Sequence, residues 1–181
     1  MENIRKENMG LLFGIIGGMA SIIFSLILYL GGVEWFVSPL AYLGFAIPIV
    51  FGVLAGIRAK KLYGGYLEYG QALKTVFLAL IVMSVISTLF SYILFNFIDV
   101  PFREALAQRT AQVAAKMMER FGASQEDIDK AMANSMNQNN YSIGKMALGL
   151  AFSCIFWFIV SAIIAAIIKK KRPPFENALN Q

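Results

Sequence analysis

The sequence predicts an all-α membrane protein in which four transmembrane helices carry an extracytoplasmic helical hairpin between spans 3 and 4. The first observation is composition, because 58% of the 181 residues are hydrophobic and only 15% are charged, unlike soluble domains. The second is clustering into four stretches without Asp, Glu or Arg, each close to the roughly 20 residues that a spanning helix needs. Together they predict one multi-pass membrane domain over residues 1–181, with spans at about 11–30, 39–57, 75–98 and 143–168 and an outer helical loop at 99–142.

The first stretch follows Arg5 and Lys6, as the core of a secretory signal does. Its apolar part is longer than a typical signal core, and the GGVEWFVSP that follows offers no small-x-small cleavage site. We therefore interpret this stretch as an uncleaved first span.

Small residues recur every fourth position in the first two spans. Lipid tails are as apolar as leucine, so helices in a membrane associate where small residues let two backbones approach. The repeats predict that the first and second helices pack against each other, and Pro48 is expected to kink or loosen the second. The repeats are Gly10, Gly14 and Gly18 in the first span and Gly44, Pro48, Gly52 and Gly56 in the second.

The stretch RAKKLYGGYLEYGQALK, residues 58–74, forms a basic loop between spans 2 and 3. Its two adjacent glycines can supply a tight turn. A helix is expected from Tyr66, which places Glu68 in its first turn, and the loop matches neither common glycine-rich phosphate-binding pattern. Topology needs the charges and the turn but not this arrangement of Tyr, Glu and Gln. The loop is therefore a candidate contact site, comprising Gly64, Gly65, Tyr66, Glu68, Tyr69, Gln71 and Lys74.

The third span has a hydroxyl-bearing side formed by Ser84, Ser87, Thr88 and Ser91. One interpretation is a hydrophilic path for a small solute or ion. The other is structural, with the hydroxyls bonded to neighbouring helices or to carbonyls of their own helix. The structural interpretation is favoured because a path usually contains a buried ionisable group and this span has none.

The outer loop, 99–142, is rich in helix formers and predicts two helices. The first is expected to begin near Pro101 and to end at Gly122. Ser124 and Asp127 nearly match the sequence pattern of a capping box, which predicts that the second helix begins here. Both helices have apolar stripes, which packing of one helix on the other would cover. The alternatives are the outer leaflet and a partner protein.

Positive charges concentrate in the amino-terminal tail, the basic loop and the tail after the fourth span, whereas acids outnumber them in the outer loop. Lys and Arg near span ends stay on the cytoplasmic side, so both termini and the basic loop are expected to face the cytoplasm from the inner membrane. Nucleic acid is not expected as a partner, because these charges flank spans and do not form one patch with interleaved aromatics. The last basic cluster mainly orients the chain and can also hold anionic lipid headgroups; it comprises Lys169, Lys170, Lys171 and Arg172.

Four segments together resemble the bacterial membrane family catalogued as domain of unknown function 4199. They are the loop GGYLEYGQALK, the span ending in FID, the segment FGASQEDIDKAM and the final KKK. The resemblance covers nearly the whole chain. It implies a bacterial cytoplasmic membrane and a domain that fills the chain, and it brings no biochemical activity with it.

The missing chemistry argues against an enzyme. Histidine is absent, Cys154 is the single cysteine, and the spans contain no Asp or Glu, so we predict no catalytic, cofactor-binding or metal site. The favoured function is a non-enzymatic accessory or interaction protein that acts with a membrane-protein partner or as a homo-oligomer. The alternative is a small-solute or ion transporter or channel subunit that uses the hydroxyl-bearing side of span 3.

Overall fold

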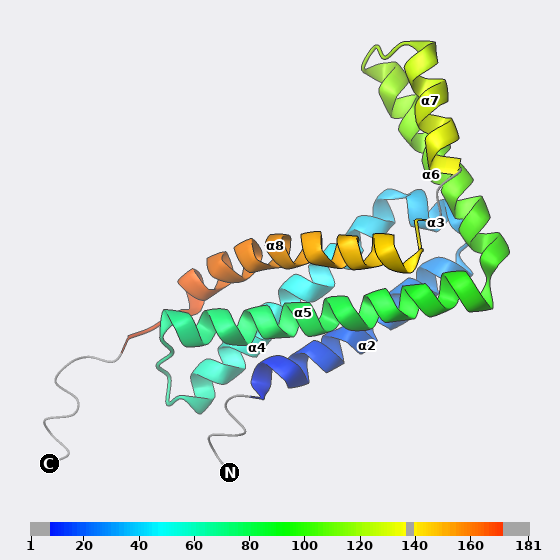
Figure 1. Cartoon of the computed structure of the whole chain (residues 1–181). Helices are drawn as coiled ribbons and strands as arrows, with labels where there is room; N and C mark the ends of the chain where they lie inside the picture. The colour runs from blue at the N-terminus through cyan, green and yellow to red at the C-terminus, as the bar shows by residue number, and fades with distance from the viewer. Residues whose placement is uncertain (1–7, 137–139, 172–181) are drawn as a thin grey trace, which may run out of the picture.

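The computed structural model describes residues 8–136 and 140–171 and arranges four long helices as a bundle (Figure 1). The first is α2, Met9–Leu30, and the last is α8, Ile143–Ile168. The second, Pro39–Leu62, joins the 3-10 helix η1, Pro39–Phe45, to α4, Ala46–Leu62. The third, Tyr69–Ile98, joins α5, Tyr69–Ile93, to the π-helical turn η2, Leu94–Ile98. Over these residues, the prediction of an all-α fold with four helices long and apolar enough to cross a membrane is confirmed.

Three further helices connect the spans: α3, Val33–Val37, after span 1, and α6, Val100–Arg120, and α7, Gln125–Met136, after span 3. Figure 1 shows α6 and α7 side by side, leaning away from the bundle at one end. We call this the hairpin end. The start of α2, the turn between α4 and α5 and the end of α8 lie together at the opposite end (Figure 1), which we call the basic end.

Helix α5 begins later than expected. Tyr66 is not helical, and Glu68 is the N-cap, whose backbone N–H donates to Gln71 Oε1 at 3.3 Å in a capping box. Leu67 cannot join the helix because its backbone is engaged elsewhere. Its N–H and carbonyl bond to Lys170 O and N, each at 2.9 Å, and its side chain is only 1% exposed.

Pro48 lies inside the second span, in the first turn of α4, where the 3-10 helix η1 gives way to the α-helix. At this position its missing N–H would have no partner within the helix in any case. The irregular part of span 2 is the 3-10 helix η1, which ends three positions before Pro48.

The first and second spans pack against each other as expected, but the glycine repeat of α2 faces α5 and not the glycines of span 2. A Cβ added at Gly14 would lie 2.6 Å from Val82 Cβ, and one at Gly18 would lie 2.8 Å from Ile86 Cδ1. Gly52 of α4 also faces α5, at 3.2 Å from Leu80 Cδ2. The reason is that α5 occupies the centre of the bundle, where its branched side chains fill the shallow surfaces that glycine leaves.

The end of α8 is fixed to the turn between α4 and α5 by three hydrogen bonds, which we call the latch. Two are the backbone bonds between Leu67 and Lys170. In the third, Lys60 Nζ donates to Ile168 O at 2.8 Å and so satisfies one of the free carbonyls at the end of α8. The latch therefore holds the last span against the second and third at the basic end.

At the hairpin end, Asp99 joins α2 to the start of α6. Its carboxylate accepts a hydrogen bond from Tyr29 Oη at 2.7 Å and another from the Phe102 N–H at 2.9 Å, which caps α6. Arg109 of α6 also binds Glu34 of α3, with Nε 2.8 Å from Oε1 and Nη2 2.9 Å from Oε2. These contacts fix the base of the hairpin.

The Asp99 contacts make stability depend on pH. The hydrogen bond from Tyr29, followed by that from the Phe102 N–H, holds the pKa of Asp99 below its ordinary value. A lowered pKa in the folded state means that the carboxylate stabilises the fold above the ordinary Asp pKa of about 3.9. This contribution is lost as pH falls through the lowered pKa. We expect acidification to lower the thermal midpoint in detergent more for the wild type than for Asp99→Asn. The control Glu119→Gln, which neutralises an exposed carboxylate of α6, should behave like the wild type, and equal losses in all three proteins would contradict the prediction.

Candidate binding cavity

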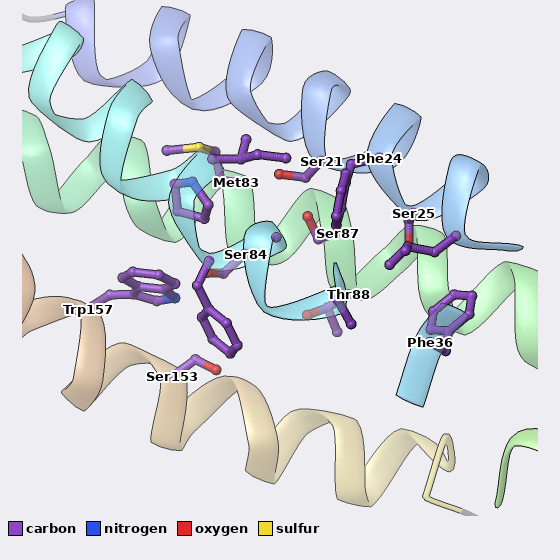
Figure 2. Close-up of a pocket in the computed structure, with 16 residues that line it drawn as sticks. Ser21, Phe24, Ser25, Phe36, Met83, Ser84, Ser87, Thr88, Ser153 and Trp157 are labelled. Carbon is purple, nitrogen blue, oxygen red and sulfur yellow. The ribbon is translucent and has the colours of Figure 1, made fainter. Parts of the chain in front are cut away.

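A cavity of about 380 Å³ lies between α2, α4, α5 and α8, with α3 and η1 at its border. Figure 2 shows the side chains that project into it from α2, α5 and α8. Six of the lining residues carry hydroxyl groups: Ser21, Ser25, Ser84, Ser87, Thr88 and Ser153. The volume falls within the roughly 300–1,000 Å³ range of small-molecule sites.

Three of these hydroxyls are already used by the backbone. Ser21, Ser84 and Ser153 donate to the carbonyls of the residues four positions earlier, at 2.9, 3.0 and 2.8 Å respectively. Such bonds to the same helix are a common way to satisfy a serine in a membrane. The hydroxyls of these three residues therefore have a structural role, which for Ser84 agrees with the structural interpretation of the hydroxyl-bearing side of span 3.

Ser87 and Thr88 differ from this group. Within the described part of the chain the side chain of Ser25 on α2, which also lines the cavity, makes no hydrogen bond, and the side chains of Ser87 and Thr88 make none either. Ser87 and Thr88 share a face of α5 with Ser84 because side chains three and four positions apart lie together on a helix. Their hydroxyls are therefore available to a ligand, either as donors or as acceptors.

Ser91 does not line the cavity, although it belongs to the same predicted side. It is half-buried and lies one turn closer to the hairpin end of α5. The structure thus brings together three of the four predicted side chains and leaves Ser91 outside.

The remaining wall of the cavity is apolar and aromatic. Phe24, Phe36, Met83 and Trp157 are labelled in Figure 2, and Trp157 is 6% exposed. No Asp, Glu, Lys or Arg is among the described residues that line it. A charged ligand would lose its hydration here without gaining a counter-charge, so the arrangement suits an uncharged molecule with an apolar body and one or two oxygen atoms.

The predicted contact loop lies at the basic end and forms a separate hollow of about 700 Å³. Gly64 and Gly65 have positive φ angles of 71° and 88°, with open space around an added Cβ, so the turn needs glycine for its backbone. Four of the predicted residues line the hollow, whereas Gly64, Gly65 and the exposed Lys74 do not. The four are Tyr66, Glu68, Tyr69 and Gln71, and Gly70, which is not among the predicted residues, also lines the hollow.

The aromatic residues of this loop bind the end of α8. Lys170 Nζ lies 5.5 Å from the ring centroid of Tyr66, and Lys169 Nζ lies 5.7 Å from that of Tyr69, within range of a cation–π interaction. The order of Tyr, Glu and Gln therefore has an intramolecular explanation, which combines these contacts with the capping box. Of the predicted headgroup cluster, Arg172 lies outside the described residues.

Sequence reasoning missed the contribution of α8 to the cavity. Ser153 and Trp157 are four residues apart and share one face of that helix, but a serine and a tryptophan in a long apolar run give no signal without knowledge of the neighbouring helix. The described residues contain no group of three or more His, Cys, Asp or Glu side chains placed to hold a metal ion.

Comparison with known proteins gives one family. The model of the family described as "Protein of unknown function (DUF4199)" matches residues 12–170, which include the cavity, the basic loop and the latch. No curated protein and no solved structure matches the chain.

Proposed function

The chain belongs to the DUF4199 family, and we propose that it is a non-enzymatic multi-pass membrane protein that binds an uncharged amphiphile between its spanning helices. The observation that carries the proposal is the pair of unbonded hydroxyls, Ser87 and Thr88, in a cavity with apolar walls. A ligand with a hydroxyl or carbonyl group would supply the missing hydrogen bonds, and its apolar body would contact the aromatic wall. The uncharged lining favours such a molecule over an ion.

Trp157 allows the proposal to be tested by fluorescence. The chain has two tryptophans, so Trp35→Phe leaves Trp157 as the single reporter inside the cavity. A straight-chain alcohol that carries bromine at its far end should quench this fluorescence saturably in detergent micelles. The bromoalkane of the same length lacks the hydroxyl and should quench more weakly, without saturation.

Matched variants identify the binding groups. In the Trp35→Phe background, Ser87→Ala with Thr88→Val should weaken binding of the alcohol by about thirtyfold, because each of the two lost hydrogen bonds is worth about 1 kcal/mol. Ser91→Ala removes a hydroxyl from the same helix outside the cavity and should leave binding unchanged. Equal quenching by alcohol and alkane, or equal affinity of the variants, would refute the proposal.

A second candidate function, an accessory or interaction protein, is supported by the hairpin. Phe121 follows α6 and is 85% exposed, and Met117 in the last turn of α6 is 57% exposed. Figure 1 places the turn between α6 and α7 at the point of the hairpin farthest from the bundle. Large exposed apolar side chains at such a point suit contact with a partner. Loss of a crosslinked membrane-protein partner on Phe121→Ser would support this candidate, and an unchanged crosslinking pattern would count against it.

We also propose that the basic end faces the cytoplasm of a bacterial inner membrane. Support comes from the lysines and arginines at that end, Arg58, Lys60 and Lys61 in the last turns of α4 and Lys169 to Lys171 after α8. Alkaline phosphatase joined after the last residue should be inactive, and the same enzyme inserted after Gly122 should be active. Phosphatase activity of the fusion after the last residue would contradict the proposed orientation.

A further inference from the structure

A groove of about 710 Å³ lies between α2 and α4 at the basic end, apart from the binding cavity. Its lining includes two basic side chains and several apolar ones, among them Leu12, Phe13, Leu54, Ile57, Arg58 and Lys61. Leu54 and Ile57 are 42% and 41% exposed, so their apolar surface is only partly covered by the protein itself.

The lining of the groove changes from apolar to basic along α4. Ile57 and Arg58 lie three and four positions after Leu54, and Lys61 lies four and three positions after them, so the four side chains share one face of the helix. With a rise of about 1.5 Å per residue, Leu54 lies roughly 10 Å deeper along the helix than Lys61. Because α4 ends at Leu62, the basic side chains lie at the surface end of the span and the apolar ones lie within it.

Arg58 and Lys61 are also the two basic side chains of α4 that are available to bind an anion. Within the described residues neither side chain has an ion pair or a hydrogen bond, whereas the Lys60 side chain of the same turn is bonded to Ile168 O. In the tail, the ammonium groups of Lys169 and Lys170 lie over tyrosine rings. An anion from outside the chain would therefore meet two unpaired cations at the mouth of this groove.

We propose that the groove holds an anionic phospholipid. The phosphate binds Arg58 and Lys61, and one acyl chain lies along Leu54, Ile57 and the facing side of α2. A guanidinium can bind phosphate through two parallel hydrogen bonds, and basic pockets between spanning helices at this level of the membrane suit anionic headgroups. The separation of charge and apolar surface along α4 matches the order of phosphate and acyl chain in one lipid molecule.

The test is native mass spectrometry of the full chain in detergent, titrated with phosphatidylglycerol or with phosphatidylcholine of the same acyl chains. We expect phosphatidylglycerol to remain bound at concentrations at which phosphatidylcholine does not. The double variant Arg58→Gln, Lys61→Gln should bind phosphatidylglycerol roughly tenfold to thirtyfold more weakly. Leu12→Trp fills the groove without changing charge and should also weaken binding.

The control is Lys74→Gln with Lys171→Gln, which removes two positive charges from the same end of the bundle but outside the groove. It should bind the lipid like the wild type. An equal loss in the control would mean diffuse attraction to the whole basic end and would overturn the proposal. Retained binding in the Arg58, Lys61 variant would do the same.

A last arm separates a lipid from a soluble anion. Glycerol phosphate carries the phosphate without acyl chains and should not displace the bound lipid. Displacement at concentrations comparable to those of the lipid would identify a soluble phosphate site and overturn the assignment to a phospholipid. Unchanged elution in size-exclusion chromatography and an unchanged thermal midpoint of each lipid-free variant confirm that it is folded.

Discussion

Gly14→Leu is expected to lower the free energy of unfolding by about 3 kcal/mol, at the upper end of the range for overpacked sites. A Cβ at Gly14 would lie 2.6 Å from Val82 Cβ and 3.0 Å from the Ala79 carbonyl oxygen. Neither atom belongs to the far end of a flexible side chain, so the new side chain can be accommodated only if α2 and α5 move apart. The measurement is reversible unfolding in mixed micelles of a mild detergent and dodecyl sulfate.

Gly149→Leu is the matched control for this prediction. Gly149 is also a glycine within a spanning helix, α8, but it is exposed and an added Cβ would meet nothing within 4 Å. The same change in composition should therefore leave stability nearly unchanged. Similar unfolding curves for the two variants would show that α2 and α5 do not pack through Gly14.

The second large effect is expected from Leu67→Ala, with a loss of about 3 kcal/mol in the free energy of unfolding. Leu67 is 1% exposed, and truncation of a buried leucine typically costs about 2–5 kcal/mol because a cavity remains. It belongs to the same hydrophobic core cluster as Ala59 of α4, Ala72 of α5 and Ile168 of α8, so the substitution weakens the junction of three spans. The same mixed-micelle unfolding measures the change.

Leu89→Ala is the control for this truncation. Leu89 lies on α5 and is 57% exposed, so a bilayer or detergent can fill the space that the smaller side chain leaves. Its effect should be well below that of Leu67→Ala. If the two truncations cost the same, Leu67 does not serve as the buried anchor of the latch.

The boundaries that depend on composition could be predicted, whereas those that depend on tertiary contacts could not. The expected fourth span, 143–168, coincides with α8 because a change from polar to apolar residues marks both of its ends. Helix α5 starts later than the sequence predicts, because the backbone of Leu67 is bonded to Lys170 and not to its own neighbours. A partner so distant in sequence leaves no local pattern.

The same distinction applies to the candidate site. The spacing of Ser84, Ser87 and Thr88 placed them on one face of a helix, and the structure turns that face toward the cavity. Spacing alone could not exclude Ser91 or add Ser153, because the extent of the cavity is set by where α2 and α8 lie around α5. The glycines of α2 likewise indicated a packing face but not the helix that fills it.

The latch bears on the order in which the protein is made. Lys60 and Ile168 are separated by 108 positions, and a ribosome adds about 5–20 residues per second, so the turn emerges on the order of 10 seconds before its partner. Until then Leu67 has neither its buried environment nor its backbone bonds. Only insertion of the fourth span closes the contact, so the state of this turn reports whether the newly made bundle is complete.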